Sequence, residues 1–196
     1  MPGRHLGGGV HGQATGPSPA DGPPIDQAGA EAAWIGLGCR MDEASIAQYI
    51  ATTFAGVDVV VASQEGGAPE VAWGDTFFIY DPDRTLVPTR QFPFATIVTH
   101  DYGDFDKESR INRPGVFRLN IGIGKETYQS LFGAGREYDF AALDELMPHP
   151  VYGRNHWACV LNPSDSTFEA VKPLVAEAHD IAVRRYKRPG AGRDSG

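Results

Sequence analysis

A short polar segment in the middle of the chain concentrates side chains that can do acid–base or metal chemistry. The sequence HDYGDFD at 100–106 combines the imidazole of His100 with the carboxylates of Asp101, Asp104 and Asp106. Ca²⁺ and Mg²⁺ prefer carboxylate oxygens, so these three aspartates form a candidate metal site. The spacing is not that of an EF-hand, because the twelfth position counted from Asp101 is Asn112 and not glutamate. The competing interpretation is a solvated loop whose aspartates form local turns.

Two later histidines offer a second set of chemical groups. His149 and His156 are separated by six residues, and His100 is a candidate third partner. Zinc needs three or four ligands in tetrahedral geometry, and this spacing matches no standard zinc motif. If the protein is an enzyme, we expect His100, Asp101 and His149 to act as its acid–base groups. The competing interpretation is that His149 packs between its two neighbouring prolines while His156 caps the strand that follows.

A third candidate is the polar face of a predicted strand over 116–121. Its alternation places Arg118 and Asn120 on one face, opposite an apolar face. Arginine can hold a carboxylate or phosphate bidentately, and Arg113 lies just before this strand. With His156 and Trp157 of a later strand, these residues form our predicted ligand-binding set. The competing interpretation pairs the arginine with one of the nearby aspartates, which is common and says little about function.

Aromatic residues recur through the same part of the chain. They could line an apolar pocket, but an ordinary core is the stronger interpretation for most of them. The residues are Trp73, Phe77, Phe78, Tyr80, Phe92, Phe94 and Trp157. Strand alternation places Phe77 and Phe78 on opposite faces, so one of the two lies outside a core that is covered by helices.

The elements that must position these residues follow from local patterns. A helix capped by Asp42 is expected to run to Gly56. A final helix should begin at the capping box of Ser166 and Glu169, with Pro173 kinking it or delaying its start. Between them the patterns predict strands at 57–62, 94–99, 116–121 and 157–161, a hairpin joining 71–73 to 76–80, and helices at 124–132 and 139–146.

This order predicts an α+β fold. Strands do not alternate regularly with helices, which argues against a doubly wound parallel sheet. We expect an antiparallel sheet with the N- and C-terminal helices packed on one face. The other face would be left to water or to a ligand.

The two ends of the chain have a different composition from the rest. Residues 1–40 contain ten glycines and five prolines. They include too few large apolar side chains to offset the conformational entropy that is lost when a chain becomes ordered. We therefore expect a disordered extension at 1–40, one domain at 41–188 and a disordered tail at 189–196. The run MDEASIAQYI from Met41 resembles a natural start, so we expect the extension to reflect an upstream start codon.

Composition narrows the classes of partner. The formal net charge of −8 disfavours a surface that neutralises nucleic-acid phosphates. No apolar run reaches the roughly 18 residues of a membrane span. The two cysteines, Cys39 and Cys159, form neither a CxxC motif nor a disulfide framework, so a reducing cytoplasm is expected and Cys159 is interpreted as inert core.

Longer phrases resemble a known family over nearly all of 41–188. They are PEVAWGDTFFIYDPDR, PFATIVTHDYGDFD, RPGVFRLNIGIGKETYQSLFG and MPHPVYGRNHWACVLNPS, and they resemble a bacterial domain-of-unknown-function family. More distantly, the strand at 157–161 followed by a closing helix is similar to the ending of MmcQ/YjbR-like proteins. That resemblance implies a frataxin-like (CyaY-like) fold and a DNA-binding label. The chain departs from the label because it is acidic and lacks a basic stripe.

These observations leave three functions open. We expect an uncharacterised small-molecule-binding or accessory protein of a bacterial cytoplasm, with no cofactor indicated. A small hydrolase or isomerase that uses His/Asp acid–base or metal chemistry is the alternative. Nucleic-acid binding of the MmcQ/YjbR kind is the second alternative, disfavoured by the charge.

Overall fold

Six strands form one antiparallel sheet in the computed structural model, which describes residues 40–133 and 135–188. The strand order is β1-β2-β3-β4-β6-β5. The strands are β1 (Val57–Val61), β2 (Thr76–Tyr80), β3 (Pro93–Val98), β4 (Arg118–Gly122), β5 (Met147–Pro148) and β6 (Trp157–Leu161). All described residues belong to one structural unit, Leu37–Gly196. The disorder predicted for both ends falls outside the described residues, except at Arg40, which forms an isolated bridge with Ser164.

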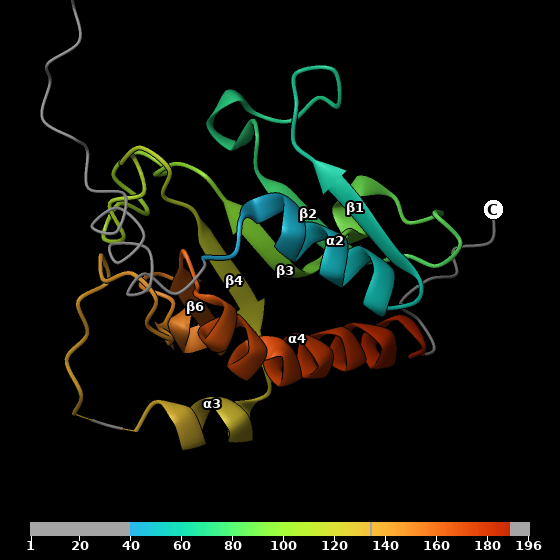
Figure 1. The fold of residues 1–196 in the computed structure, drawn as a ribbon. Helices are drawn as coiled ribbons and strands as arrows, with labels where there is room; N and C mark the ends of the chain where they lie inside the picture. Colours follow the sequence, from blue (N-terminus) through green and yellow to red (C-terminus); the bar gives the residue numbers. More distant parts are fainter. Residues whose placement is uncertain (1–39, 134, 189–196) are drawn as a thin grey trace, which may run out of the picture. The chain divides into compact units, whose positions relative to one another are not determined.

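Two helices cover one face of this sheet. Helix α2 (Glu43–Thr53) contacts β1 and β2, and α4 (Asp165–Tyr186) contacts β2, β3 and β4 (Figure 1). The shorter α3 (Lys125–Leu131) is tied to α4, because the Glu177 carboxylate accepts hydrogen bonds from the backbone N–H of Gly124 and the hydroxyl of Thr127. The predicted α+β arrangement with both terminal helices on one face is therefore confirmed.

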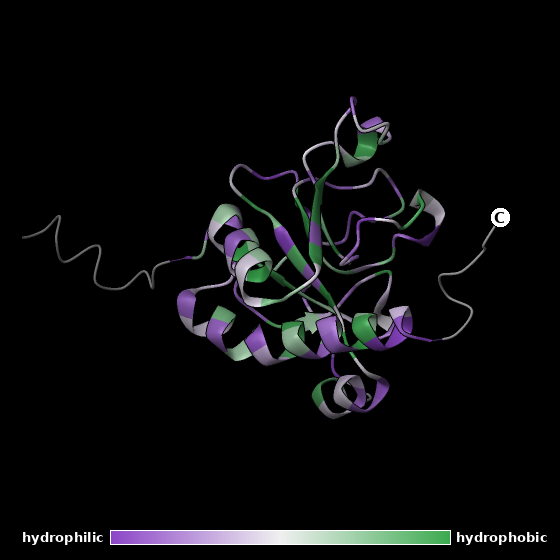
Figure 2. Ribbon diagram, turned by 90° about the vertical axis from the view of Figure 1, so that its right-hand side faces the viewer, coloured by the Kyte–Doolittle hydropathy of each residue, from purple (hydrophilic) through white to green (hydrophobic). Residues whose placement is uncertain are grey.

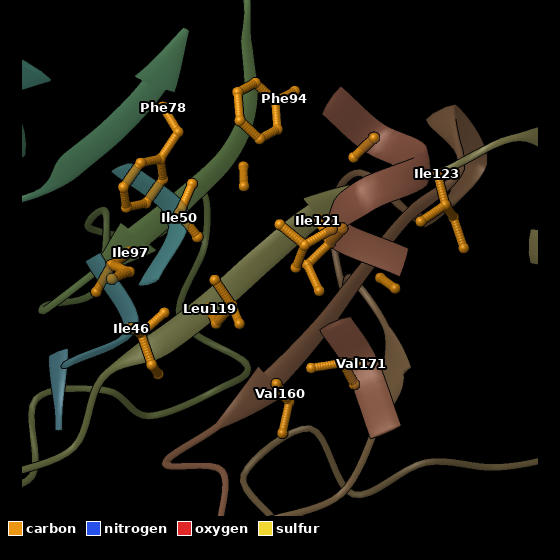
Figure 3. Close-up of a cluster of buried hydrophobic side chains, with 14 of the residues drawn as sticks. Ile46, Ile50, Phe78, Phe94, Ile97, Leu119, Ile121, Ile123, Val160 and Val171 are labelled. Atoms are coloured by element: carbon orange, nitrogen blue, oxygen red, sulfur yellow. The ribbon is translucent and has the colours of Figure 1, made fainter. Parts of the chain in front are cut away.

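The apolar core lies between the helices and the sheet. Leu119 and Ile121 of β4 are fully buried, and Phe117 before the strand is nearly so, as the predicted alternation requires. Burying each such side chain contributes about 1.5–3 kcal/mol to folding. The core contains side chains from α2 and α4 and from β2, β3, β4 and β6. Figure 3 shows several of them, including Ile46, Ile50, Phe78, Phe94, Ile97, Val160 and Val171.

The opposite face of the sheet carries the polar side chains of β4. We call it the open face, and it bears Arg118, Asn120, Thr96, Phe77 and Trp157. In the side view of Figure 2, loops rather than long helices lie on the side of the sheet away from α2 and α4. This face was expected to be left to water or to a ligand, and that expectation is wrong for its polar side chains. Arg118, Asn120 and Thr96 are buried, because loops of the chain itself cover them.

Two predicted elements are wrong. The segment expected as a strand at 71–73 instead forms the end of a 3-10 helix, Glu70–Ala72, followed by a turn at Trp73. Strand β2 pairs with β1. The predicted helix at 139–146 is irregular, because the Asp139 carboxylate accepts a hydrogen bond from the N–H of Ala141 and forms a local turn. Asp144 also has a φ of 63°, which an α-helix does not permit.

The start of α4 differs from the prediction by two residues. Ser164, rather than Ser166, is the N-cap, and its hydroxyl accepts a hydrogen bond from the N–H of Thr167. The helix then continues through Pro173 for 22 residues in all. Buried side chains on both sides of the proline, Val171 and Val175, hold the helix against the sheet across this point. None of the helices in the described ranges is long and apolar enough to cross a membrane.

Candidate functional site

A cavity of about 720 Å³ lies on the open face. Its volume falls in the range of about 300–1,000 Å³ that is usual for small-molecule sites. Its walls are mostly apolar and come from segments far apart in the sequence: Ala62, Ala68, Phe77, Phe92, Phe105 and Tyr152. The alternation of side chains along each strand explains why the cavity lies on this face. Residues that follow or precede a core residue in a strand point away from the helices and toward the open face.

The floor of the cavity is built on the guanidinium of Arg118, which is 1% exposed. Its Nε donates to Asn120 Oδ1 at 2.8 Å. Nη1 donates to Asp106 Oδ1 at 3.0 Å and to Ser109 Oγ at 2.8 Å. Nη2 donates to Asp106 Oδ2 at 2.5 Å and lies 3.1 Å from His149 Nε2. The arginine is therefore paired with an aspartate of the chain itself, as the competing interpretation proposed.

Asn120 extends this polar floor into β3. Its Nδ2 donates to the hydroxyl of Thr96 at 2.9 Å. The pairing of Thr96 with Asn120 across β3 and β4 places the two side chains side by side on the open face. A continuous hydrogen-bonded row thus crosses the sheet beneath the cavity.

His149 is held as a neutral imidazole. Its Nδ1 accepts hydrogen bonds from the backbone N–H groups of Val151 and Tyr152, both at 3.1 Å. Burial and the nearby Arg118 lower the pKa of His149 to about 3, against a weaker opposing effect of Asp106. Because Nδ1 accepts, the single proton of the neutral ring lies on Nε2.

A second buried network borders the cavity. The carboxylate of Asp75, which is fully buried, accepts hydrogen bonds from the N–H of Thr99 at 2.9 Å and from the hydroxyl of Tyr102. His100 stacks on the Tyr102 ring and contacts the carbonyl of Val71. Burial raises the pKa of Asp75, and burial together with Asp75 raises the pKa of Tyr102. Tyr102 lines the cavity, so this network positions one wall.

The three aspartates predicted to bind a metal have separate partners. Asp101 accepts the N–H of Ile111 at 2.8 Å, and exposed Asp104 pairs with Lys107 at 2.6 Å. Asp106 lies under the cavity in the ion pair described above. Within 40–133 and 135–188, no group of three or more His, Cys, Asp or Glu side chains is placed to hold a metal ion.

The predicted catalytic residues likewise occupy different networks. His100 lies beside the carboxylate of Asp75, and His149 contacts Arg118. The Asp101 carboxylate accepts a hydrogen bond from the backbone N–H of Ile111. The described contacts do not join these three side chains to one another. Cys159 is buried, and burial raises its pKa to about 12, which fits an inert core position.

Three of the five predicted ligand-binding residues line the cavity, and the other two do not. Arg118, Asn120 and Trp157 line the cavity. Arg113 instead donates to backbone carbonyls at 109, 110 and 141, and so fixes the loop that precedes β4. His156 adopts a left-handed φ of 64° and packs its ring against Tyr128.

Several cavity residues were not predicted from the sequence. Tyr102, Phe105 and Tyr152 line it, as does Thr96. The available signal was the presence of Tyr and Phe inside polar, glycine-containing loops, where no core is expected to cover them. That signal indicates exposure but not the cavity to which each ring belongs.

The comparisons with known proteins identify a family. The model of a family of unknown function (DUF6194) matches residues 41–191, so the chain belongs to this family. No curated protein and no solved structure matches the chain. The predicted resemblance to a domain-of-unknown-function family is confirmed, while the more distant likeness to MmcQ/YjbR-like proteins stays a prediction.

Proposed function

We propose that this member of DUF6194 binds a small, mainly apolar molecule on the open face of its sheet. The observation that carries the proposal is the cavity of about 720 Å³ over the Arg118 network. Its size suits one organic ligand, and its apolar walls would bury most of the ligand surface.

Exposed aromatic side chains at the cavity support this function. Phe105 is 63% exposed, Phe92 57% and Tyr152 43%, and all three line the cavity. Large apolar groups that gather in contact with water are typical of binding sites. Their burial by a ligand would supply favourable free energy, at about 25 cal/mol for each Å² removed from water.

The floor supports binding because it is already ordered. Arg118 has a partner for each of its nitrogen atoms, and Asn120 is fixed by Thr96. Fixed polar groups need no rearrangement when a ligand enters, which reduces the cost of association.

Binding fits these groups better than acid–base catalysis. The neutral His149, with its pKa lowered to about 3, is a weak base near neutral pH. Nucleic-acid binding is also less well supported, because Arg118, the one arginine among the described residues that line the cavity, is neutralised by Asp106.

The proposal is tested with the full-length chain and the uncharged dye N-phenyl-1-naphthylamine, which fluoresces strongly in apolar sites. Ala68→Trp fills the cavity from a loop at its wall, and Ala51→Trp adds the same side chain on the exposed surface of α2. We expect the parent protein and Ala51→Trp to bind the dye, and Ala68→Trp to bind it at least about tenfold more weakly, a difference of about 1.4 kcal/mol. Equal binding by all three proteins, or no binding by any, would contradict the proposal.

A further inference from the structure

The contact between His149 and Arg118 contains more hydrogen-bond donors than acceptors. The imidazole faces three external donors: two backbone N–H groups at Nδ1 and the Arg118 Nη2 at Nε2. A neutral ring has one nitrogen that accepts and one that donates. When Nδ1 accepts, Nε2 carries the proton of the ring. The nitrogens His149 Nε2 and Arg118 Nη2 then lie 3.1 Å apart, and neither can accept a hydrogen bond from the other.

The nearest acceptor does not relieve this surplus. Asp106 Oδ2 lies 3.8 Å from His149 Nε2, beyond hydrogen-bond distance, and it already accepts from Arg118. The other tautomer, with the proton on Nδ1, would leave the N–H groups of Val151 and Tyr152 without their acceptor. Both residues line the cavity at its floor, where Arg118 is 1% and His149 3% exposed. An acceptor atom of a ligand that reached this floor would supply the partner that the two donors lack.

The charges around the cavity select the kind of acceptor. Among the lining residues, Arg118 and Asp106 cancel each other and His149 is neutral. A carboxylate or phosphate entering here would lose its hydration without gaining a net positive partner, which is costly. A carbonyl oxygen accepts two hydrogen bonds through its two lone pairs and brings no net charge.

The walls indicate what the carbonyl is attached to. Phe77, Phe92, Phe105, Tyr152 and Trp157 all line the cavity. Aromatic side chains pair favourably with other rings in stacked or edge-to-face geometry. An aromatic body of the ligand would thus be in contact with these rings while its carbonyl reached the floor.

We propose that the cavity binds an uncharged aromatic carbonyl compound, such as an aryl ketone, ester or amide, whose oxygen accepts hydrogen bonds from His149 Nε2 and Arg118 Nη2. The inference rests on the proposed binding function and specifies its ligand class. It requires an uncharged acceptor atom beside His149 Nε2 and Arg118 Nη2 on the floor of the cavity.

The test compares three naphthalenes that differ in one substituent. 2-Acetylnaphthalene carries a carbonyl, 2-ethylnaphthalene lacks it, and 2-naphthoate carries a charge. Each displaces N-phenyl-1-naphthylamine from the full-length protein in a competition titration. We expect the ketone to bind about tenfold more tightly than the hydrocarbon and the carboxylate, which is the effect of one or two net hydrogen bonds.

A variant then locates the carbonyl. In His149→Asn, the amide oxygen can still accept from the N–H groups two and three residues ahead, as in an Asx turn, but no group replaces Nε2–H. We expect the tenfold preference for the ketone over the hydrocarbon to fall below about threefold in this variant. His156 is not among the residues that line the cavity, and its left-handed backbone is one that asparagine tolerates. His156→Asn should therefore keep the full preference.

The outcomes separate the two proposals. Dye binding with equal affinity for the three naphthalenes, or with the carboxylate tightest, overturns the carbonyl inference and leaves the binding function standing. An unchanged ketone preference in His149→Asn also overturns it. If the dye itself does not bind, the proposed function fails and the inference fails with it.

Discussion

At the scale of single residues, the buried pair of Arg118 and Asp106 determines the character of the site. Both side chains are almost fully buried, and each binds the other through two hydrogen bonds. Such a pair contributes little net stability compared with apolar groups of similar size, because both charges lose their hydration. Removing one partner, however, leaves the other charge buried without compensation.

Arg118→Met should therefore reduce the free energy of unfolding by about 3–5 kcal/mol, measured by urea denaturation. The double variant Arg118→Met/Asp106→Leu should recover most of this loss, since no uncompensated charge remains. As a matched control, Lys107→Met breaks the exposed pair with Asp104 and should have no measurable effect. A double variant as unstable as the single one would contradict the account of the floor.

The protonation of His149 gives the protein a defined pH dependence. The pKa of His149 is lowered to about 3 in the folded state by burial and Arg118, although Asp106 opposes the shift, while the unfolded value is about 6.5. Between these two values the unfolded state binds more protons, so lowering the pH favours unfolding. The stability that the neutral His149 contributes to the folded state is fully present above about pH 6.5 and decreases as the pH falls toward 3.

Between pH 7 and pH 5 this effect should remove about 2 kcal/mol from the free energy of unfolding. His149→Asn should lose about 2 kcal/mol less than the parent protein over the same interval, as measured by urea titrations at both pH values. His156→Asn keeps His149 and should behave like the parent. The same pH dependence in His149→Asn and the parent would show that this imidazole is not held neutral.

The sequence predicted part of this residue-level arrangement. Alternation along β4 was enough to place Arg118 and Asn120 together on the face away from the helices. It could not identify Asp106 as the partner, because three aspartates of similar spacing precede the strand and only loop geometry selects one. His149 was expected among catalytic groups, but its contact with the arginine depends on a turn 31 residues away.

At the scale of elements, the start of α4 shows how two similar signals compete. Ser164 and Ser166 both precede the apolar stripe, and the sequence favoured Ser166 because Glu169 completes a capping box. In the structure, the Ser164 hydroxyl accepts the N–H of Thr167 at 3.2 Å, while its backbone N–H binds the Asp144 carboxylate at 2.6 Å. The second contact comes from a distant segment, which local pattern could not supply.

Ser164→Ala should lower the free energy of unfolding by about 1 kcal/mol, the usual effect of losing an N-cap side chain. Ser166→Ala, which changes a residue inside the first turn, should have a much smaller effect. Thermal unfolding of the two variants, side by side with the parent, is the measurement. If both variants were destabilised equally, or Ser166→Ala more strongly, Ser164 would not be the main N-cap of α4, which would contradict the structure.

At the scale of the whole described unit, the arrangement of sheet and terminal helices was predictable and the cavity was not. Apolar periodicity is a local property, so it identified α2, α4 and most strands. The walls of the cavity come from separate segments around Ala62–Ala72, Phe92, Tyr102–Asp106 and His149–Trp157. These segments come together because the long loops fold over the open face. No local sequence pattern encodes the way in which those loops fold.

Backbone amide chemical shifts would show whether a ligand binds on the open face of the sheet. The full-length chain, labelled with ¹⁵N, would be titrated with N-phenyl-1-naphthylamine. We expect the largest shift changes at Val98, Phe105 and Tyr152, which line the cavity, and small changes at Ile46 and Val175 in the helix-covered core. Changes confined to the helices, or spread evenly over the protein, would contradict binding on the open face.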